Sequence, residues 1–123
     1  MDHTALQREF PLLARIEGPH VVPPELMRLA KTYRQAVRLC LHLARQRRPG
    51  LKLTDIAAAC ELTRQHVTDY FHEDDKPSRR SLPPEDVQNV EDYLGNTAIS
   101  QWHARRAGLT VLEEIQAGAR AVA

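Results

Sequence analysis

Four polar side chains between residues 65 and 72 recur at a spacing that places them on one side of a helix. They are Gln65, Thr68, Asp69 and His72, at positions i, i+3, i+4 and i+7. An amide can bond to adenine N6 and N7 together, a carboxylate can accept from cytosine N4, and a threonine can contact a thymine methyl group. Arg64, at the border of this set, can reach guanine or a phosphate. These residue types are therefore able to bond to nucleic-acid bases, and an ordinary solvent-exposed helix can carry the same polar stripe.

The opposite side of the same helix is apolar. When residues 64–72 are placed at about 100° per residue, Val67, Tyr70 and Phe71 fall within one arc. We expect these three side chains to pack on the rest of the protein. The polar side chains are then exposed on a helix whose opposite side is fixed by packing.

The segment before this helix is suited to lie against it. Residues 57–59 are three alanines, which have no bulk to keep a neighbouring helix away, and Thr54 is a candidate N-cap for this first helix. The connection at 61–63 is too short for a comfortable antiparallel pair, which favours a steep crossing with Leu62 packed in the angle. This geometry is typical of a helix-turn-helix, whose second helix, here at 63–72, enters the major groove of DNA. Two short helices joined by a turn also occur as ordinary core architecture.

The remainder of the chain is also predicted to be helical. No stretch shows a sustained two-residue alternation of β-branched or aromatic residues, which would indicate a strand. Apolar stripes of helical period, with flanking prolines, glycines and threonines, predict further helices at about residues 24–48, 84–94, 98–107 and 111–122. The fold class is therefore all-α, a compact domain of about five to six helices with the helix-turn-helix at its centre.

Capping signals near both ends of the chain suggest its organisation. Thr4 with Gln7 and Thr110 with Glu113 have the spacing of capping boxes, and each pair can open a helix. We expect three parts: an N-terminal helical segment at 1–22, a helix-turn-helix domain at 23–108, and a C-terminal helix at 109–123.

The charge is unevenly distributed, although the net charge of +1 is small. Residues 28–80 hold twelve basic and six acidic side chains, whereas residues 1–27 hold two and four, and residues 81–123 hold three and six. A basic middle between acidic ends favours a polyanionic partner. The charge distribution alone is equally compatible with a basic surface that faces only solvent and binds no partner. The arginines at 45, 47 and 48 suit any helix C-terminus, and the basic residues of the loop at 73–80 can balance its own acids.

The helix pair resembles a known family of DNA-binding domains. The positions that match the small and apolar positions of the helix-turn-helix in lambda-repressor-like (XRE-type) domains of phage-type regulators are Ala57, Cys60, Leu62, Val67 and Tyr70. The order of features is similar as well: a long first helix, the helix pair, a polar loop containing KPS and a helix ending in LG, over roughly residues 25–107. Glu61 departs from the family, which usually has glycine at this turn because φ is often positive there.

This resemblance implies a transcriptional regulator, a repressor or an activator, that binds double-stranded DNA with the helix at 63–72. The residues expected to contact base edges are Arg64, Gln65, Thr68, Asp69 and His72. The residues expected to contact phosphates are Lys52, Thr54, Thr63, Lys76, Arg79 and Arg80.

Regulators of this type act as homodimers on partly palindromic sites, with recognition helices about 34 Å apart. The dimer contact must lie outside the polar set. The first candidate is the last helix, through Val111, Leu112, Ile115 and Ala119. The second candidate is the apolar N-terminal segment around residues 6–16. Both segments can instead extend the core of one monomer.

No other chemistry is indicated. His66 and His72 are six residues apart, about 240° around one helix, so they cannot share a metal ion with Cys60. No glycine-rich phosphate loop, nucleophile elbow or Cys–His constellation is present, and we expect no enzyme activity, cofactor, metal or small-molecule ligand. Cys40 and Cys60 are expected as small core residues in a reducing cytosol. The acidic start, and the lack of an apolar run of about 20 residues, predict a cytoplasmic protein that does not contact membranes.

Two rival classes of protein remain compatible with the sequence. One is a helical protein–protein interaction module, such as an antitoxin-like or phage adaptor protein, whose basic middle meets an acidic protein. The other is an architectural DNA protein without sequence preference. Asp69 argues for a specific reader, because phosphates repel a carboxylate unless it accepts a hydrogen bond from a base.

Overall fold

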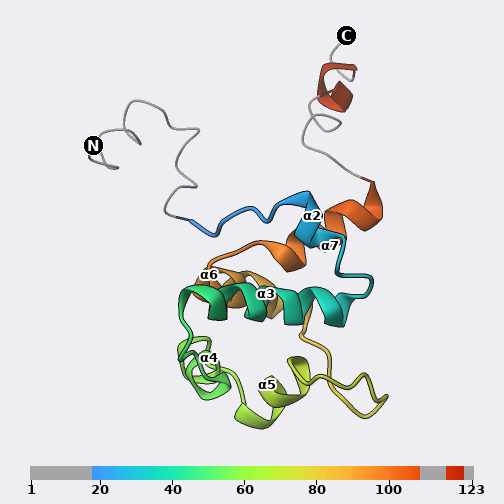
Figure 1. Cartoon of the computed structure of the whole chain (residues 1–123). Helices are drawn as coiled ribbons and strands as arrows, with labels where there is room; N and C mark the ends of the chain where they lie inside the picture. Colours follow the sequence, from blue (N-terminus) through green and yellow to red (C-terminus); the bar gives the residue numbers. More distant parts are fainter. Residues whose placement is uncertain (1–17, 109–115, 121–123) are drawn as a thin grey trace, which may run out of the picture.

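The computed structural model describes residues 18–108 and 116–120 (Figure 1). Its elements are α2 (Pro24–Met27), α3 (Tyr33–Arg47), α4 (Leu53–Ala59), α5 (Arg64–Tyr70), the 3-10 helix η2 (Pro84–Asp86), α6 (Val87–Leu94) and α7 (Ala98–Ala107). Residues 116–120 are helical too. In these described residues no strand is present, and the predicted all-α class is confirmed. None of the described helices is long and apolar enough to cross a membrane.

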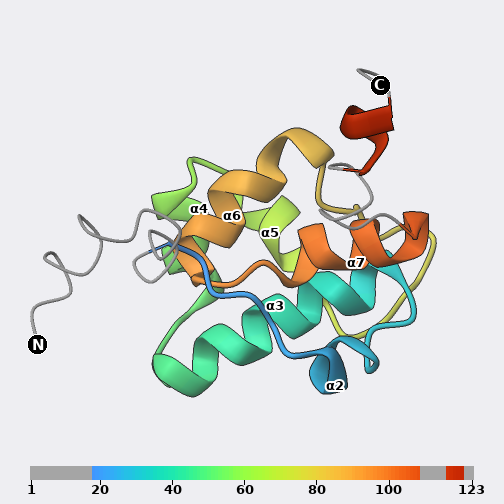
Figure 2. The ribbon, with the colours of Figure 1, turned by 90° about the horizontal axis from the view of Figure 1, so that it is seen from above.

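α3 runs through the middle of the fold, with other helices on two sides of it (Figures 1 and 2). In Figure 1, α2 and α7 lie above α3, whereas α4, α5 and the loop after α5 lie below it. Small and apolar residues recur along α3 at helical spacing, and Ala36, Val37, Cys40 and Ala44 each expose 1% or less of their surface. The small side chains among them let neighbouring helices come close. Larger side chains from those helices complete the core, among them Met27, Ile56, Val90 and Ile99.

The longest predicted helix is interrupted at residues 28–32, where the sequence predicted a continuous run. α2 makes one turn, and α3 then starts afresh. The Thr32 hydroxyl accepts a hydrogen bond from the backbone N–H of Gln35 at 3.2 Å, and the side-chain oxygen of Gln35 accepts from the N–H of Lys31 at 2.7 Å. This capping satisfies donors that a helix start leaves unpaired, and it stabilises a new start at this point.

Two glycines end α6 and α7, as the sequence predicted. The φ angle is 85° at Gly95 and 70° at Gly108. Residues with a Cβ atom adopt these left-handed conformations only with strain, which explains why glycine occupies both helix ends.

The buried Asn96 side chain fixes the start of α7. Thr97, the predicted cap, is the N-cap residue, but its hydroxyl makes no capping bond. Instead, the Asn96 side-chain oxygen accepts from the N–H of Ala98 at 3.2 Å, and its amide nitrogen donates to the carbonyl of Cys40 at 2.9 Å. Asn96 therefore joins α7 to α3 as well as capping it.

Both cysteines are free thiols. Cys40 is fully buried, as expected of a core residue, and its burial raises the pKa of the thiol. Cys60 is half-buried, and its Sγ lies 3.6 Å from the carbonyl oxygen of Asn89. In the described part of the chain, no group of three or more His, Cys, Asp or Glu side chains is placed to hold a metal ion.

Candidate nucleic-acid interface

A tight turn with one left-handed residue joins α4 to α5. Glu61 has a φ of 55°, and among the described residues it is the only one other than glycine with a positive φ. Leu62 follows, donating its N–H to the carbonyl of Ala57 at 2.9 Å, and its side chain packs against the core. The turn therefore has, at Glu61, the conformation that glycine adopts without strain.

Only one of the three alanines expected at the helix contact is buried. Ala57 exposes 3% of its surface, whereas Ala58 and Ala59 are exposed. The prediction for these two residues was wrong. A helix turns by about 100° per residue, so three consecutive side chains cannot all face one neighbour.

α5 is anchored by the three residues that the sequence predicted. Val67, Tyr70 and Phe71 expose 0%, 5% and 6% of their surface. Two of them lie on the helix, and Phe71 is its C-cap residue. The rotation of α5 about its axis is therefore set by packing against the core.

The outer side of α5 presents three exposed polar residues from its first five positions: Arg64, Gln65 and Thr68. The Thr68 hydroxyl donates its proton to the carbonyl of Arg64 at 3.1 Å. What Thr68 can still offer a ligand is a methyl group and an acceptor lone pair. The side-chain donors of Arg64 and Gln65 make no hydrogen bond to any residue that the structure describes, and both side chains are exposed.

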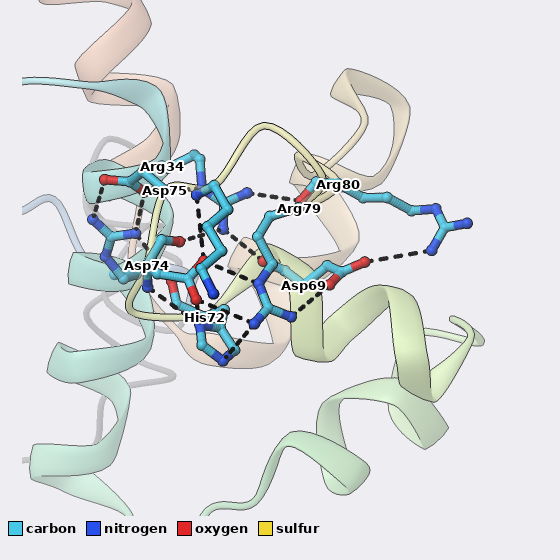
Figure 3. A network of polar contacts seen from close by, with 9 residues as sticks. Arg34, Asp69, His72, Asp74, Asp75, Arg79 and Arg80 are labelled. Carbon is cyan, nitrogen blue, oxygen red and sulfur yellow. Dashed lines mark hydrogen bonds and ion pairs between the residues drawn. The ribbon is translucent and has the colours of Figure 1, made fainter.

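The Asp69 carboxylate is bound by the loop that follows α5 (Figure 3). It lies 3.2 Å from the guanidinium of Arg79 and 3.4 Å from that of Arg80. Its side chain is 17% exposed. A base amino group would therefore compete with two cations for the oxygens of Asp69.

His72 lies in that same loop rather than on the helix. α5 ends at Tyr70, which is earlier than the end near residue 72 that the sequence predicted. The His72 ring places Nδ1 3.1 Å from the Asp74 carboxylate and Nε2 3.0 Å from the Arg79 guanidinium. Because an arginine can only donate, Nε2 accepts from Arg79, and the backbone N–H of Asp74 donates to Nδ1 at 3.2 Å.

Arg79 is at the centre of this network (Figure 3). Its guanidinium lies 3.0 Å from the Asp74 carboxylate as well as close to Asp69. Hydrogen bonds from Arg79 lower the pKa of Asp74 to about 2 and also lower the pKa of Asp69. The two carboxylates in turn raise the pKa of Arg79. The sequence left open whether the basic residues of the loop balance its acids, and Arg79 does so.

Two arginines of α3 hold the end of α5, and the sequence interpretation missed both. Arg34 donates to the carbonyl of Asp69 at 2.7 Å, and Arg38 donates to the carbonyl of His72 at 3.0 Å. Both also pair with Asp75, at 3.1 Å and 2.8 Å. A helix C-terminus leaves carbonyls without partners, and these guanidinium groups supply them. Their i, i+4 spacing on one side of α3 was the available signal.

The predicted phosphate contacts come from the segments that lie below α3 in Figure 1. Exposed residues among them are Lys52, Thr54, Thr63 and Lys76. Arg80 exposes 58% of its side chain, and Arg79 exposes 25%. Two threonines differ from expectation: α4 starts at Leu53, so Thr54 lies in its first turn, and Thr63 is the N-cap residue of α5 but makes no capping bond. The Thr63 hydroxyl is not used for capping.

Most of the predicted dimer contact falls outside the described residues, namely Val111, Leu112, Ile115 and the segment at 6–16. Ala119 lies in the helical residues 116–120 and is exposed.

Comparisons of this chain with protein-family models, with curated proteins and with solved structures find no match. The interpretation of the site therefore depends on its own residues.

Proposed function

We propose that this protein is a sequence-specific, DNA-binding transcriptional regulator that reads the major groove with α5. The observation that carries the proposal is the two-sided character of α5. Val67 is completely buried and holds the helix from behind, while Arg64 and Gln65 are exposed at its N-terminal end. Helix-turn-helix proteins contact base edges with the N-terminal residues of their second helix. The left-handed Glu61 in the turn and the resemblance to lambda-repressor-like domains support the same function.

In this proposal Arg64, Gln65 and Thr68 are the base contacts. Arg64 can donate two hydrogen bonds to O6 and N7 of guanine, and Gln65 can pair with N6 and N7 of adenine. Each such bidentate pair discriminates against a wrong base by about 1–3 kcal/mol. Thr68 has already given its proton to the Arg64 carbonyl, so it suits a thymine methyl group or a base amino group.

Asp69 and His72 have a positioning role in this proposal. To accept from cytosine N4, the Asp69 carboxylate would have to give up a contact with Arg79 or Arg80. Both ring nitrogens of His72 are occupied within the loop. We therefore assign base reading to the first five residues of α5, and we assign these two residues to holding its end and the loop.

Phosphate contacts would supply affinity that does not depend on sequence. The exposed candidates are Lys52, Thr54, Thr63, Lys76 and Arg80. Each phosphate that a cation neutralises releases bound counterions, so the logarithm of the affinity falls with the logarithm of salt concentration by about 0.9 per contact. The three cations of this set therefore predict a marked salt dependence.

We further propose that the protein acts in the cytoplasm as a homodimer, without a cofactor and without catalysis. Two copies would place their α5 helices in successive major grooves about 34 Å apart. The C-terminal helix expected at 109–123 is the proposed dimer contact, because the outer side of α5 must stay free for DNA.

Selection of bound sequences from a random duplex library tests the proposed function. We expect an enriched, partly palindromic motif whose half-sites are separated by about one turn of DNA. Weak binding that salt abolishes, with no enriched motif, would instead identify a protein–protein interaction module. Tight binding that selects no sequence would identify an architectural DNA protein.

A further inference from the structure

A hollow of about 730 Å³ opens on the side of α3 away from α5. It lies where the end of α2, the turn at 28–32, the start of α3 and the last turns of α7 meet. Figure 1 shows α2 and α7 on one side of α3 and α5 on the other. A duplex in contact with α5 would therefore leave this hollow open.

The rim of the hollow is cationic. Its charged lining residues are Arg28, Lys31, Arg105 and Arg106, and no Asp or Glu among the described residues lines it. All four are exposed, and none forms an ion pair with another described residue. The arginines of α3 and of the loop that lie near the end of α5 differ from these four cations, because each of those arginines pairs with an aspartate.

Helix C-termini alone do not account for this charge. A helix C-terminus carries about half a negative charge, and a helix of one turn, such as α2, carries less. Arg105 and Arg106 in the last turn of α7 already exceed what that helix end requires. With the other two cations included, the described lining residues carry four positive charges, of which a helix end offsets only about half of one.

The floor of the hollow is aromatic and apolar. Tyr33 and Trp102 meet edge to face, with ring centroids 5.9 Å apart. The Arg106 guanidinium lies over the Trp102 ring, 5.4 Å from its centroid. Stacking orients this guanidinium and leaves its in-plane N–H groups available to a carboxylate. Leu29, in the turn at 28–32, exposes 66% of its surface and adds apolar area nearby.

The aromatic floor does not suit a nucleic acid. Proteins that bind single strands stack bases on open aromatic faces. The Trp102 ring is covered by Arg106 and meets Tyr33 and His103 at its other contacts. The combination of a cationic rim and an apolar floor matches a peptide that carries both acidic and apolar side chains.

We propose that this hollow binds an acidic, leucine-containing segment of a partner protein. Carboxylates of the segment pair with the cationic rim, and a leucine packs against the apolar atoms of the floor beside the Arg106 guanidinium. The binding does not depend on DNA recognition by α5, since α2 and α7, whose residues line the hollow, lie on the other side of α3 from α5 (Figure 1).

Trp102 is the only tryptophan of the chain, so its fluorescence reports on the hollow directly. The probe is a short synthetic peptide of Asp, Glu and Leu, and its control has Asn and Gln at the acidic positions. We expect the acidic peptide to change the Trp102 fluorescence saturably, and the neutral peptide to bind at least about tenfold more weakly. Equal affinity for the two peptides would overturn the proposal.

Variants then locate the peptide. Arg105→Gln with Arg106→Gln should weaken binding of a fluorescently labelled acidic peptide, followed by anisotropy, at least about tenfold. The matched control is Arg47→Gln with Arg64→Gln, which removes the same charge from exposed residues elsewhere and should change the affinity less than about twofold. Equal losses in the two double variants would show attraction by overall charge and would overturn the proposed site.

The same variants separate this inference from the proposed function. The change at residues 105 and 106 should leave DNA selection by the protein intact, whereas Arg64→Gln should alter DNA selection and leave peptide binding intact. A single-stranded oligonucleotide is the competitor. If it displaces the peptide and binds more tightly than the peptide does, the proposal is overturned in favour of a nucleic-acid site. If no duplex is selected but the peptide still binds, the proposed function fails and this inference stands.

Discussion

The Arg79 guanidinium lies 3.2 Å from the Asp69 carboxylate, so the loop after α5 is tied to the helix that it follows. This pairing explains how an acid can lie beside a surface that is proposed to meet phosphates. The negative charge of Asp69 is compensated within the protein before any DNA arrives. The pair also gives Asp69 a structural role that does not require a base.

A double-mutant cycle tests this pairing. Asp69→Asn and Arg79→Gln should each lower the urea midpoint of unfolding, because each leaves a charged partner without its counterpart. The double variant should lose less than the two losses combined, since neither charge then remains. Arg47→Gln, on an exposed arginine at the end of α3, is the control and should add independently to Asp69→Asn. Additive losses in the first cycle would show that the two residues do not interact in solution.

Acid should weaken the fold through Asp74. Its pKa is lowered from 3.8 to about 2 by the Arg79 hydrogen bonds, so the folded state favours the ionised form. The stabilisation is fully present above the unfolded-state pKa and is lost as the pH falls towards about 2. Urea unfolding of the wild type and of Asp74→Asn should differ at pH 7, and the difference should shrink below pH 3.8. A difference that stays constant across this range would contradict the ion pair.

The parts of the fold that follow from local signals could be predicted. The inward side of α5 at Val67 and Tyr70 follows from helical periodicity alone. The helix ends at Gly95 and Gly108 follow from the left-handed conformation that glycine tolerates. The spacing of Thr32 and Gln35 is that of a capping box, so it could have predicted the interruption at 28–32. Apolar residues continue through this segment, which led to the prediction of one continuous helix.

The parts that depend on distant contacts could not be predicted. Arg34 meets Asp69 and Asp75, which are 35 and 41 positions away in the sequence. The spacing of Arg34 and Arg38 shows that they share one side of α3, but no local pattern identifies partners so distant in the sequence, one of which is a backbone carbonyl. The sequence therefore indicated which side of α5 is exposed. It did not indicate that arginines of the following loop pair with Asp69 near the end of this helix.

Replacing Glu61 with glycine should stabilise the protein. A residue with a Cβ atom pays about 1–2 kcal/mol for the left-handed conformation found here at φ 55°, whereas glycine loses about 0.5–1 kcal/mol more backbone entropy on folding. Glu61→Gly should therefore raise the free energy of unfolding by up to about 1 kcal/mol, measured by thermal denaturation. Glu61→Ala is the control and should give no such gain, because alanine keeps the strain. A loss of stability in Glu61→Gly would argue that the turn relaxes in solution.

Truncating the outer side of α5 should alter DNA selection without unfolding the protein. Gln65 and Thr68 are both exposed, and within the described part of the chain the Thr68 hydroxyl bonds only to its own helix. The double change Gln65→Ala with Thr68→Ala removes no buried contact, and alanine favours a helix by a few tenths of a kcal/mol, so the melt by circular dichroism should move by only a few degrees. The selected motif should lose information at the positions these residues read. Gln88→Ala with Asn89→Ala, two exposed residues of α6, should also move the melt by only a few degrees and should leave the motif unchanged. An unchanged motif in the α5 variant would exclude Gln65 and Thr68 as base readers, and an unfolded variant would show that these side chains are part of the core.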